Sequence, residues 1–135
     1  MTTSVWQGEV LRAFVEQVRV AAGLETTAEA EAVSRATLRT LAERVSSGQV
    51  DDVMQGLPSE LRHELSQRSG QARSFDRAGF VERVSGEITT ADADAADHQA
   101  RAVLRVLQDW SPTGEIDRTV DQLPPALAEM FREGV

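Results

Sequence analysis

The stretch Phe14-Val15-Glu16-Gln17-Val18 returns 66 residues later as Phe80-Val81-Glu82-Arg83-Val84. The likeness runs without a gap, so that residues 14–65 align with residues 80–131. Identical residues stand at 15 of these 52 positions, whereas unrelated sequences of ordinary composition would share roughly three. They are Phe14/Phe80, Val15/Val81, Glu16/Glu82, Val18/Val84, Ala30/Ala96, Arg35/Arg101, Ala36/Ala102, Leu38/Leu104, Arg39/Arg105, Leu41/Leu107, Gly48/Gly114, Asp51/Asp117, Leu57/Leu123, Pro58/Pro124 and Leu61/Leu127. A repeat of this length indicates two copies of one supersecondary unit.

The composition is that of an acidic globular domain. A chain of 135 residues is long enough to bury a core without disulfide or metal staples. The net charge is −8, and residues 1–67 and 68–135 each carry −4 of it. Such a field repels phosphate backbones and anionic lipids, so the sequence predicts neither nucleic-acid binding nor membrane-surface binding.

The sequence also predicts a cytoplasmic protein. It contains no Cys, which excludes disulfides and thiolate catalysis and favours a reducing compartment. Residues 1–6 show neither the basic nor the apolar region of an export signal. No apolar run is long enough to span a bilayer.

The sequence pattern of each copy predicts four helices. In the first copy, apolar residues at helical spacing indicate an amphipathic helix over roughly residues 5–22, which Gly23 stops. Its apolar stripe consists of Val10, Leu11, Phe14, Val15 and Val18. Thr26 and Glu29 form a capping box at the start of a second helix that runs to about Val45. Asp92 is the corresponding N-cap in the second copy.

The second helix of the first copy is expected to bury one face, and the turns after it lead into two shorter helices. The buried positions are Ala30, Val33, Thr37, Leu38, Leu41 and Val45. Gly48 and Gly114 predict the turns. The third helices carry Val50, Val53, Met54 and Leu57 in one copy and Ile116, Val120 and Leu123 in the other. Pro58 and Pro124 mark the start of the fourth helices, because Pro loses no needed donor at the first helical position.

These elements predict an all-α fold of two tandem four-helix repeats related by pseudo-two-fold symmetry and packed into one compact helical domain. The domain covers residues 1–135, with repeats over about 5–65 and 77–133 and an aperiodic linker over 66–76. One copy alone is near the size at which a core becomes marginal. We therefore expect the apolar faces of the two copies to pack on each other.

The repeated phrases resemble the bacterial family known as domain of unknown function 2267. Members of that family show Phe-Leu-x-x-Val, then Val-Leu-x-x-Leu, then Leu-Ser-x-Gly-Glu, then Gln-Leu-Pro-x-x-Leu. The chain has Phe14-Val15-Glu16-Gln17-Val18, Thr37-Leu38-Arg39-Thr40-Leu41, Val45-Ser46-Ser47-Gly48-Gln49 and Gly56-Leu57-Pro58-Ser59-Glu60-Leu61, and again Phe80-Val81-Glu82-Arg83-Val84, Val103-Leu104-Arg105-Val106-Leu107, Ser111-Pro112-Thr113-Gly114-Glu115 and Gln122-Leu123-Pro124-Pro125-Ala126-Leu127. The resemblance implies a duplicated helical fold. It supplies no activity, cofactor or catalytic residue.

The second helices carry charged residues four positions apart. They are Glu31, Arg35, Arg39 and Glu43 in the first copy and Asp97, Arg101, Arg105 and Asp109 in the second. This spacing keeps a charge ladder on one helical face, and each pair with the acid first contributes about 0.2–0.5 kcal/mol to the helix. The simpler interpretation is a solvated row of ion pairs. The functional interpretation is an interaction surface formed by Arg35, Arg39, Arg101 and Arg105, for a carboxylate-bearing partner or for the other repeat.

An acidic cluster opens the second helix of the second copy. Asp92, Asp94, Asp97 and His98 lie within seven residues, and carboxylates with a His can bind a divalent cation. Acids in a first helical turn are expected from the helix dipole alone, however, and the first copy has Ala32 where the second has His98. We favour capping over metal binding.

The sequence pattern indicates no catalytic, cofactor-binding or metal-binding residue. Tyr, Lys and Cys are absent, and no phosphate loop, nucleophile elbow or zinc-binding helix motif occurs. We therefore expect a non-enzymatic protein, a soluble helical interaction or regulatory module that docks a protein partner and needs no cofactor. The alternative is a carrier of a small ligand or metal, with its site between the repeats. Homodimerisation stays open, because a symmetric object can pair isologously.

Overall fold

The computed structural model describes residues 2–44, 49, 52, 55–57, 61–62, 76–88, 92–112, 114–123 and 125–133. Within these ranges the chain forms helices and turns and no strand. The helices are α1 (Thr2–Ala22), α2 (Thr27–Arg44), α5 (Arg77–Glu87), α6 (Ala93–Trp110), α7 (Glu115–Asp121) and α8 (Pro125–Glu133). The all-α class predicted from the sequence is confirmed.

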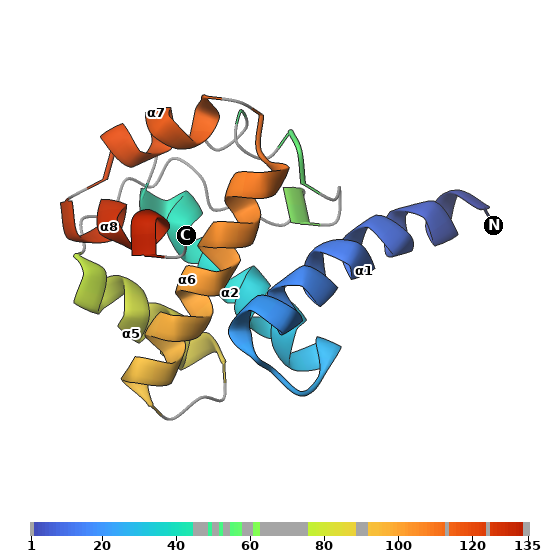
Figure 1. Ribbon diagram of the computed structural model, residues 1–135, viewed down its shortest axis with the longest axis horizontal. Helices are drawn as coiled ribbons and strands as arrows, with labels where there is room; N and C mark the ends of the chain where they lie inside the picture. The colour runs from blue at the N-terminus through green and yellow to red at the C-terminus, as the bar shows by residue number, and fades with distance from the viewer. Residues whose placement is uncertain are drawn as a thin grey trace.

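Helix α1 ends where the sequence predicts. Gly23 follows it with a φ of +70°, a left-handed conformation that glycine adopts without strain, and the Leu24 amide bonds the Arg19 carbonyl at 2.9 Å. The first turns of α1 project away from the other helices (Figure 1). Val10, which was expected in the apolar stripe, is 41 % exposed. The helical period identifies a face of the helix, whereas burial also requires a neighbouring element.

Helices α2 and α6 begin at the predicted caps. The Glu29 amide donates to Thr26 Oγ1, and the Thr26 amide donates to Glu29 Oε1, both at 3.2 Å, which completes the capping box. Asp92 caps α6 by accepting from the Asp94 amide at 2.8 Å. The two helices start and end at positions that are aligned in the two copies, 66 residues apart. Asp76, at the end of the predicted linker, caps α5 by accepting from the Gly79 amide at 3.0 Å.

The last two helices follow a turn at Gly114, whose φ is +89°. Helix α7 covers the predicted third helix of the second copy, and α8 covers its fourth. The third and fourth helices of the first copy, and residues 66–75 of the predicted linker, lie largely outside the described residues.

Helices α2 and α6 pack against each other at the centre of the fold. Helix α1 packs on both of them, and so does α5, while α7 and α8 cover another side of the assembly (Figure 1). Residues from both halves of the chain join in one hydrophobic cluster. Its largest fully buried side chains are Phe14, Phe80, Leu38, Leu61, Leu104, Leu107, Leu127, Met130, Val18 and Val33.

The core therefore follows the alignment of the two copies. Phe14 and Phe80 are both buried, as are Leu38 and Leu104. The arrangement is also crosswise, because α1 from the first half lies on α6 from the second, and α5 lies on α2. These two crosswise contacts position the charged residues of α2 and α6.

Candidate functional site between helices α1 and α6

The charged residues of the first-copy ladder already form ion pairs within the chain. Arg35 Nε bonds Glu31 Oε2 at 3.1 Å, as the spacing predicts. Arg39 reaches out of its own helix and places Nη2 at 3.1 Å from Oε1 of Glu87 on α5. Glu43, with a side chain only 8 % exposed, accepts from Nη1 of Arg83 on α5 at 3.4 Å. The ion pairs of Arg39 and Glu43 therefore connect α2 to α5.

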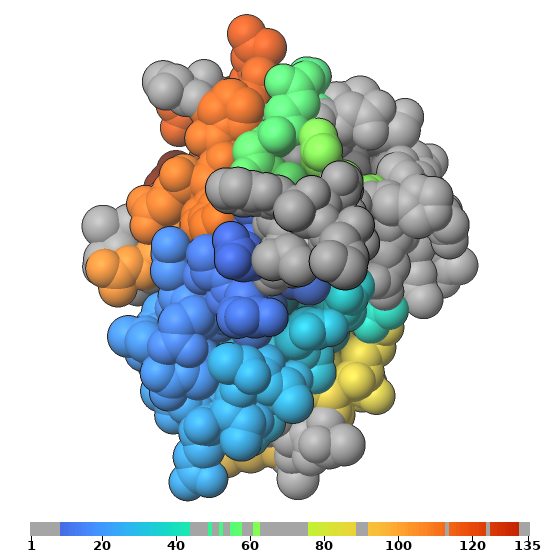
Figure 2. Space-filling model, turned by 90° about the vertical axis from the view of Figure 1, so that its right-hand side faces the viewer, coloured from blue at the N-terminus to red at the C-terminus, as the bar shows by residue number. Residues whose placement is uncertain are grey.

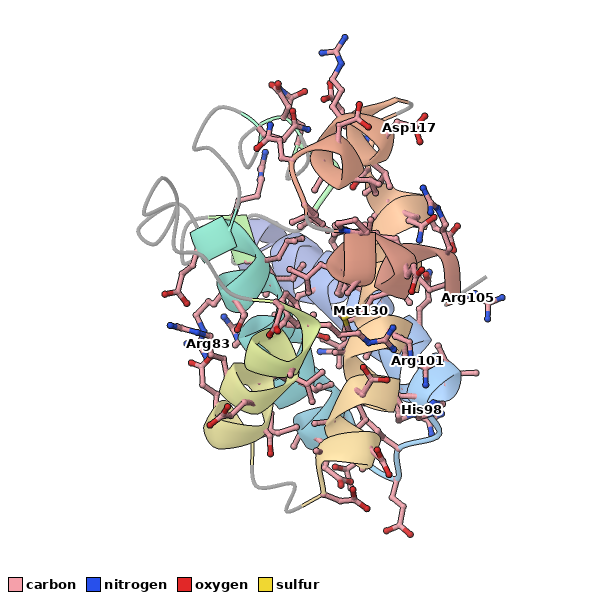
Figure 3. The ribbon with its side chains drawn as sticks, turned by 90° about the vertical axis from the view of Figure 1, so that its left-hand side faces the viewer. Arg83, His98, Arg101, Arg105, Asp117 and Met130 are labelled. Atoms are coloured by element: carbon pink, nitrogen blue, oxygen red, sulfur yellow. The ribbon has the colours of Figure 1, made fainter. Side chains whose placement is uncertain are left out.

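The second-copy ladder divides into a paired and an unpaired part. Arg101 Nε bonds Asp97 Oδ2 at 3.1 Å, and Arg77 holds both oxygens of the same carboxylate at 3.1 and 3.0 Å. Arg105 and Asp109 are exposed, and within the described part of the chain neither side chain forms a hydrogen bond or ion pair. In Figure 3, Arg105 extends outward at one edge of the molecule, and Arg83 lies at the opposite edge.

The difference arises from two residues of α1. At the crosswise contact between α2 and α5, Arg83 and Glu87 provide the partners for the ladder charges. The aligned positions on α1 are Gln17 and Ala21. Helix α6 therefore keeps the ladder charges, while α1 lacks the two side chains that would pair with them.

A groove of about 380 Å³ lies at this contact. It is lined by Glu16, Gln17, Val20, Ala21, Arg105, Val106 and Asp109. Val20 is an apolar side chain that is 65 % exposed. Figure 2 shows α1 and α6 side by side on the surface. The groove is open and offers a cation, an anion and an apolar side chain to a binding partner.

Trp110 fixes the relative position of the two helices beside the groove. Its Nε1 donates to Gln17 Oε1 at 3.0 Å, and its ring meets Phe14 edge-on with a centroid distance of 5.4 Å and an interplanar angle of 73°. Edge-to-face pairs of this kind contribute beyond their buried area. In the alignment of the two copies Trp110 stands where the first copy has Arg44, and this difference alone does not indicate its contact with α1.

Glu16, at the edge of the groove, is already engaged by α1. Its carboxylate accepts from Arg19 Nε at 2.9 Å and from Arg19 Nη2 at 2.6 Å. These bonds hold the pKa of the Glu16 carboxyl below its usual value. The anion that remains available in the groove is Asp109.

The acidic cluster at the start of α6 serves structural roles. Asp92 is the cap, and Asp97 pairs with Arg77 and Arg101. His98 is exposed (Figure 3). Among the residues that the structure describes, no group of three or more His, Asp or Glu side chains could hold a metal ion. His63 lies outside those residues.

A larger hollow of about 800 Å³ lies between α5 and α6. Its lining includes Arg77 and Asp97, which neutralise each other, and the small residues Ala78, Ser85 and Gly86. Its lining also includes the exposed acids Glu82 and Asp94, so its remaining charges are both negative, whereas the groove between α1 and α6 presents a cation and an anion. We take the latter as the candidate site.

The fold and this groove define an all-α protein with an open, charged surface site. The family described as "Uncharacterized conserved protein (DUF2267)" matches residues 11–130, and the chain belongs to this family. The search of curated proteins finds no match. No helix in the described part of the chain has the length and apolar character that crossing a membrane requires.

Proposed function

We propose that this protein is a non-enzymatic interaction module that docks a protein partner in the groove between α1 and α6. The observation that carries the proposal is Arg105, the ladder arginine that pairs with nothing in the described residues and stands beside the exposed Val20. Arg35, Arg39 and Arg101 each bond a carboxylate of this chain. The interaction surface expected from four arginines is therefore proposed to reduce to Arg105 and its neighbours.

A protein fits this groove better than a small molecule. Small-molecule sites enclose most of their ligand, whereas Gln17, Val20, Arg105 and Asp109 are all exposed. Arginine beside apolar surface is typical of protein interfaces. A carboxylate of the partner would take the place at Arg105 that Glu87 takes at Arg39.

We also propose that the fold is a duplication, with two four-helix repeats related by an approximate two-fold axis between α2 and α6. The matching bounds of α2 and α6 and the crosswise packing of α1 and α5 support it. The repeats would cover about residues 5–65 and 77–133 of one domain, joined by the 66–76 linker. The groove would then be one of two equivalent seams, the other being closed by its ion pairs.

A cytoplasmic, non-enzymatic role is part of this proposal. The chain contains no Cys, which suits a reducing compartment. The sequence contains no phosphate loop, nucleophile elbow or zinc-binding helix motif, which supports a non-enzymatic role.

The test compares affinity capture by variants of the full chain. Tagged wild type and Arg105→Glu are incubated with native lysate, and every captured protein is quantified, including untagged copies of the chain. Arg12→Glu is the matched control, because Arg12 is also an exposed arginine of the described residues but lies outside the groove. Capture that Arg105→Glu abolishes and Arg12→Glu preserves supports the proposal. Equal capture by all three contradicts it.

A second variant gives Arg105 an ion-pair partner within its own chain. Ala21→Glu places a carboxylate at the position aligned with Glu87, where it can pair with Arg105 as Glu87 pairs with Arg39. We expect this variant to fold normally and to lose the partner. Retained capture would show that the partner docks elsewhere.

The alternative function is a small-ligand carrier that uses the same groove between the repeats. The unpaired Arg105 and Asp109 could hold opposite charges of one ligand. A ligand that binds the native state raises the melting temperature by mass action. A thermal-shift screen of metabolites and divalent cations, repeated on Arg105→Glu, decides between carrier and docking module.

A further inference from the structure

We propose that the occupant of the groove is a second copy of this chain. Two α6 helices would meet antiparallel across a two-fold axis, with Arg105 of each copy bonding the partner's Asp109. This inference rests on the proposed docking function and names its partner. The feature that carries it is the self-complementary order of charge along the unpaired end of α6.

The chain already contains this pairing once, inside the monomer. Helix α2 presents Arg39 and Glu43, and α5 presents Arg83 and Glu87, in each case arginine first and acid one turn later. The first residue of each segment pairs with the last of the other, at 3.1 and 3.4 Å. Two Arg-x-x-x-acid segments thus pair in antiparallel directions.

The end of α6 carries the same pattern without a counterpart. Arg105 and Asp109 are one turn apart, both are exposed and both line the groove. In the alignment, Gln17 of α1 corresponds to Arg83, and Ala21 corresponds to Glu87. Gln17 accepts a hydrogen bond from Trp110. At these two aligned positions α1 therefore has no charged side chain to complete the pattern, whereas the α6 of another copy has the required sequence and direction.

Isologous interfaces impose a condition that this surface meets. In a two-fold dimer, residue i contacts j of the partner and j contacts the partner's i, so the surface must complement itself. A segment with a cation followed by an anion satisfies this condition with two ion pairs per dimer. Val20, 65 % exposed beside these charges, would lose contact with water in the same interface.

The test is a charge exchange followed by sedimentation velocity over a range of protein concentrations. Arg105→Asp leaves each copy with acids at both positions 105 and 109, and Asp109→Arg leaves each copy with arginines at both. Either change alone converts two attractions into repulsions and should weaken dimerisation by roughly tenfold or more. The double variant Arg105→Asp/Asp109→Arg restores a self-complementary order and should dimerise again. A mixture of the two single variants should form mixed dimers more readily than either variant pairs with itself.

The outcomes separate this inference from the function on which it rests. A concentration-dependent dimer that weakens with added salt, is lost in each single variant and returns in the double variant supports it. A wild type that stays monomeric at millimolar concentration overturns it, and so does a dimer that the single variants leave unchanged. Arg105-dependent capture of a different protein would then still support the docking function. Thermal unfolding of every variant, compared with Arg12→Glu, confirms that each one is folded.

Discussion

Gln49 and Glu115 occupy aligned positions of the two copies and bond each other. Gln49 Nε2 donates to the Glu115 carbonyl at 3.0 Å and to its Oε1 at 3.3 Å, and it also reaches Thr119 Oγ1 at 3.1 Å. These hydrogen bonds join residues 66 and 70 positions apart in the sequence, so they connect the two halves of the chain through polar side chains.

The first prediction concerns this contact. Gln49→Glu removes the donor and sets a second carboxylate beside that of Glu115, at a position only 7 % exposed. We expect the free energy of unfolding at pH 7 to fall by about 1–3 kcal/mol. Adding Glu115→Gln, which exchanges the two residues, should restore part of the loss. Chemical denaturation measures both variants, and Gln55→Glu is the control, because Gln55 is exposed. No loss in the single variant would contradict the bonding of Gln49.

The second prediction concerns the approach of residues 55–57 to the end of α6. A β-carbon built at Gly56 collides with the carbonyl oxygen of Trp110. Gly56→Ala should therefore lower the free energy of unfolding by about 1–3 kcal/mol or more, since backbone must shift. Gly86→Ala is the matched control, because Gly86 lies in α5 with no atom near its added methyl group. It should raise stability by about 0.5–1 kcal/mol, and equal effects of the two changes would contradict the close approach.

The sequence predicted those features that local chemistry decides. Gly23 ends α1 in a left-handed conformation, Thr26 begins α2 through its capping box, and Asp92 begins α6. The pair Phe14 and Phe80 is buried as the repeat indicated. Each of these outcomes depends on a few neighbouring residues, so one sequence suffices to predict it.

The candidate site could not be predicted in the same way, because it depends on which helix faces which. Arg39 and Glu43 fit an intrahelical ladder, yet both bond residues of α5. Arg105 and Asp109 fit the same ladder and face a groove. The alignment held one usable signal, since Gln17 and Ala21 stand where the second copy has Arg83 and Glu87. That signal gains meaning only once α1 is known to lie on α6.

The third prediction concerns a buried hydroxyl. Thr37 is fully buried, and its Oγ1 has no hydrogen-bond partner in the described structure. The aligned residue is Val103, which is also buried. Because a buried hydroxyl without a partner costs free energy, Thr37→Val should leave stability unchanged or raise it by about 1 kcal/mol.

Ser34 provides the matched comparison for that change. Its Oγ donates to the Ala30 carbonyl at 2.7 Å in an equally buried site, and the aligned residue is Ala100. Ser34→Ala removes a bond that is made, so it should lower the free energy of unfolding by about 0.5–1.5 kcal/mol. Thermal and chemical unfolding of both variants tests the pair. A greater loss in Thr37→Val than in Ser34→Ala would show that the Thr37 hydroxyl has a partner.

The fourth prediction concerns the pH dependence of the groove edge. Hydrogen bonds from Arg19 lower the pKa of the Glu16 carboxyl in the folded protein, whereas an unfolded Glu titrates near about 4.3. A folded pKa below the unfolded one means that the stabilisation is present above the unfolded pKa and is lost as the pH falls through the folded pKa. Carboxyl NMR titration should place the pKa of Glu16 below its usual value, and Arg19→Ala should return it toward that value. A Glu16 titration unchanged by Arg19→Ala would contradict the assigned cause.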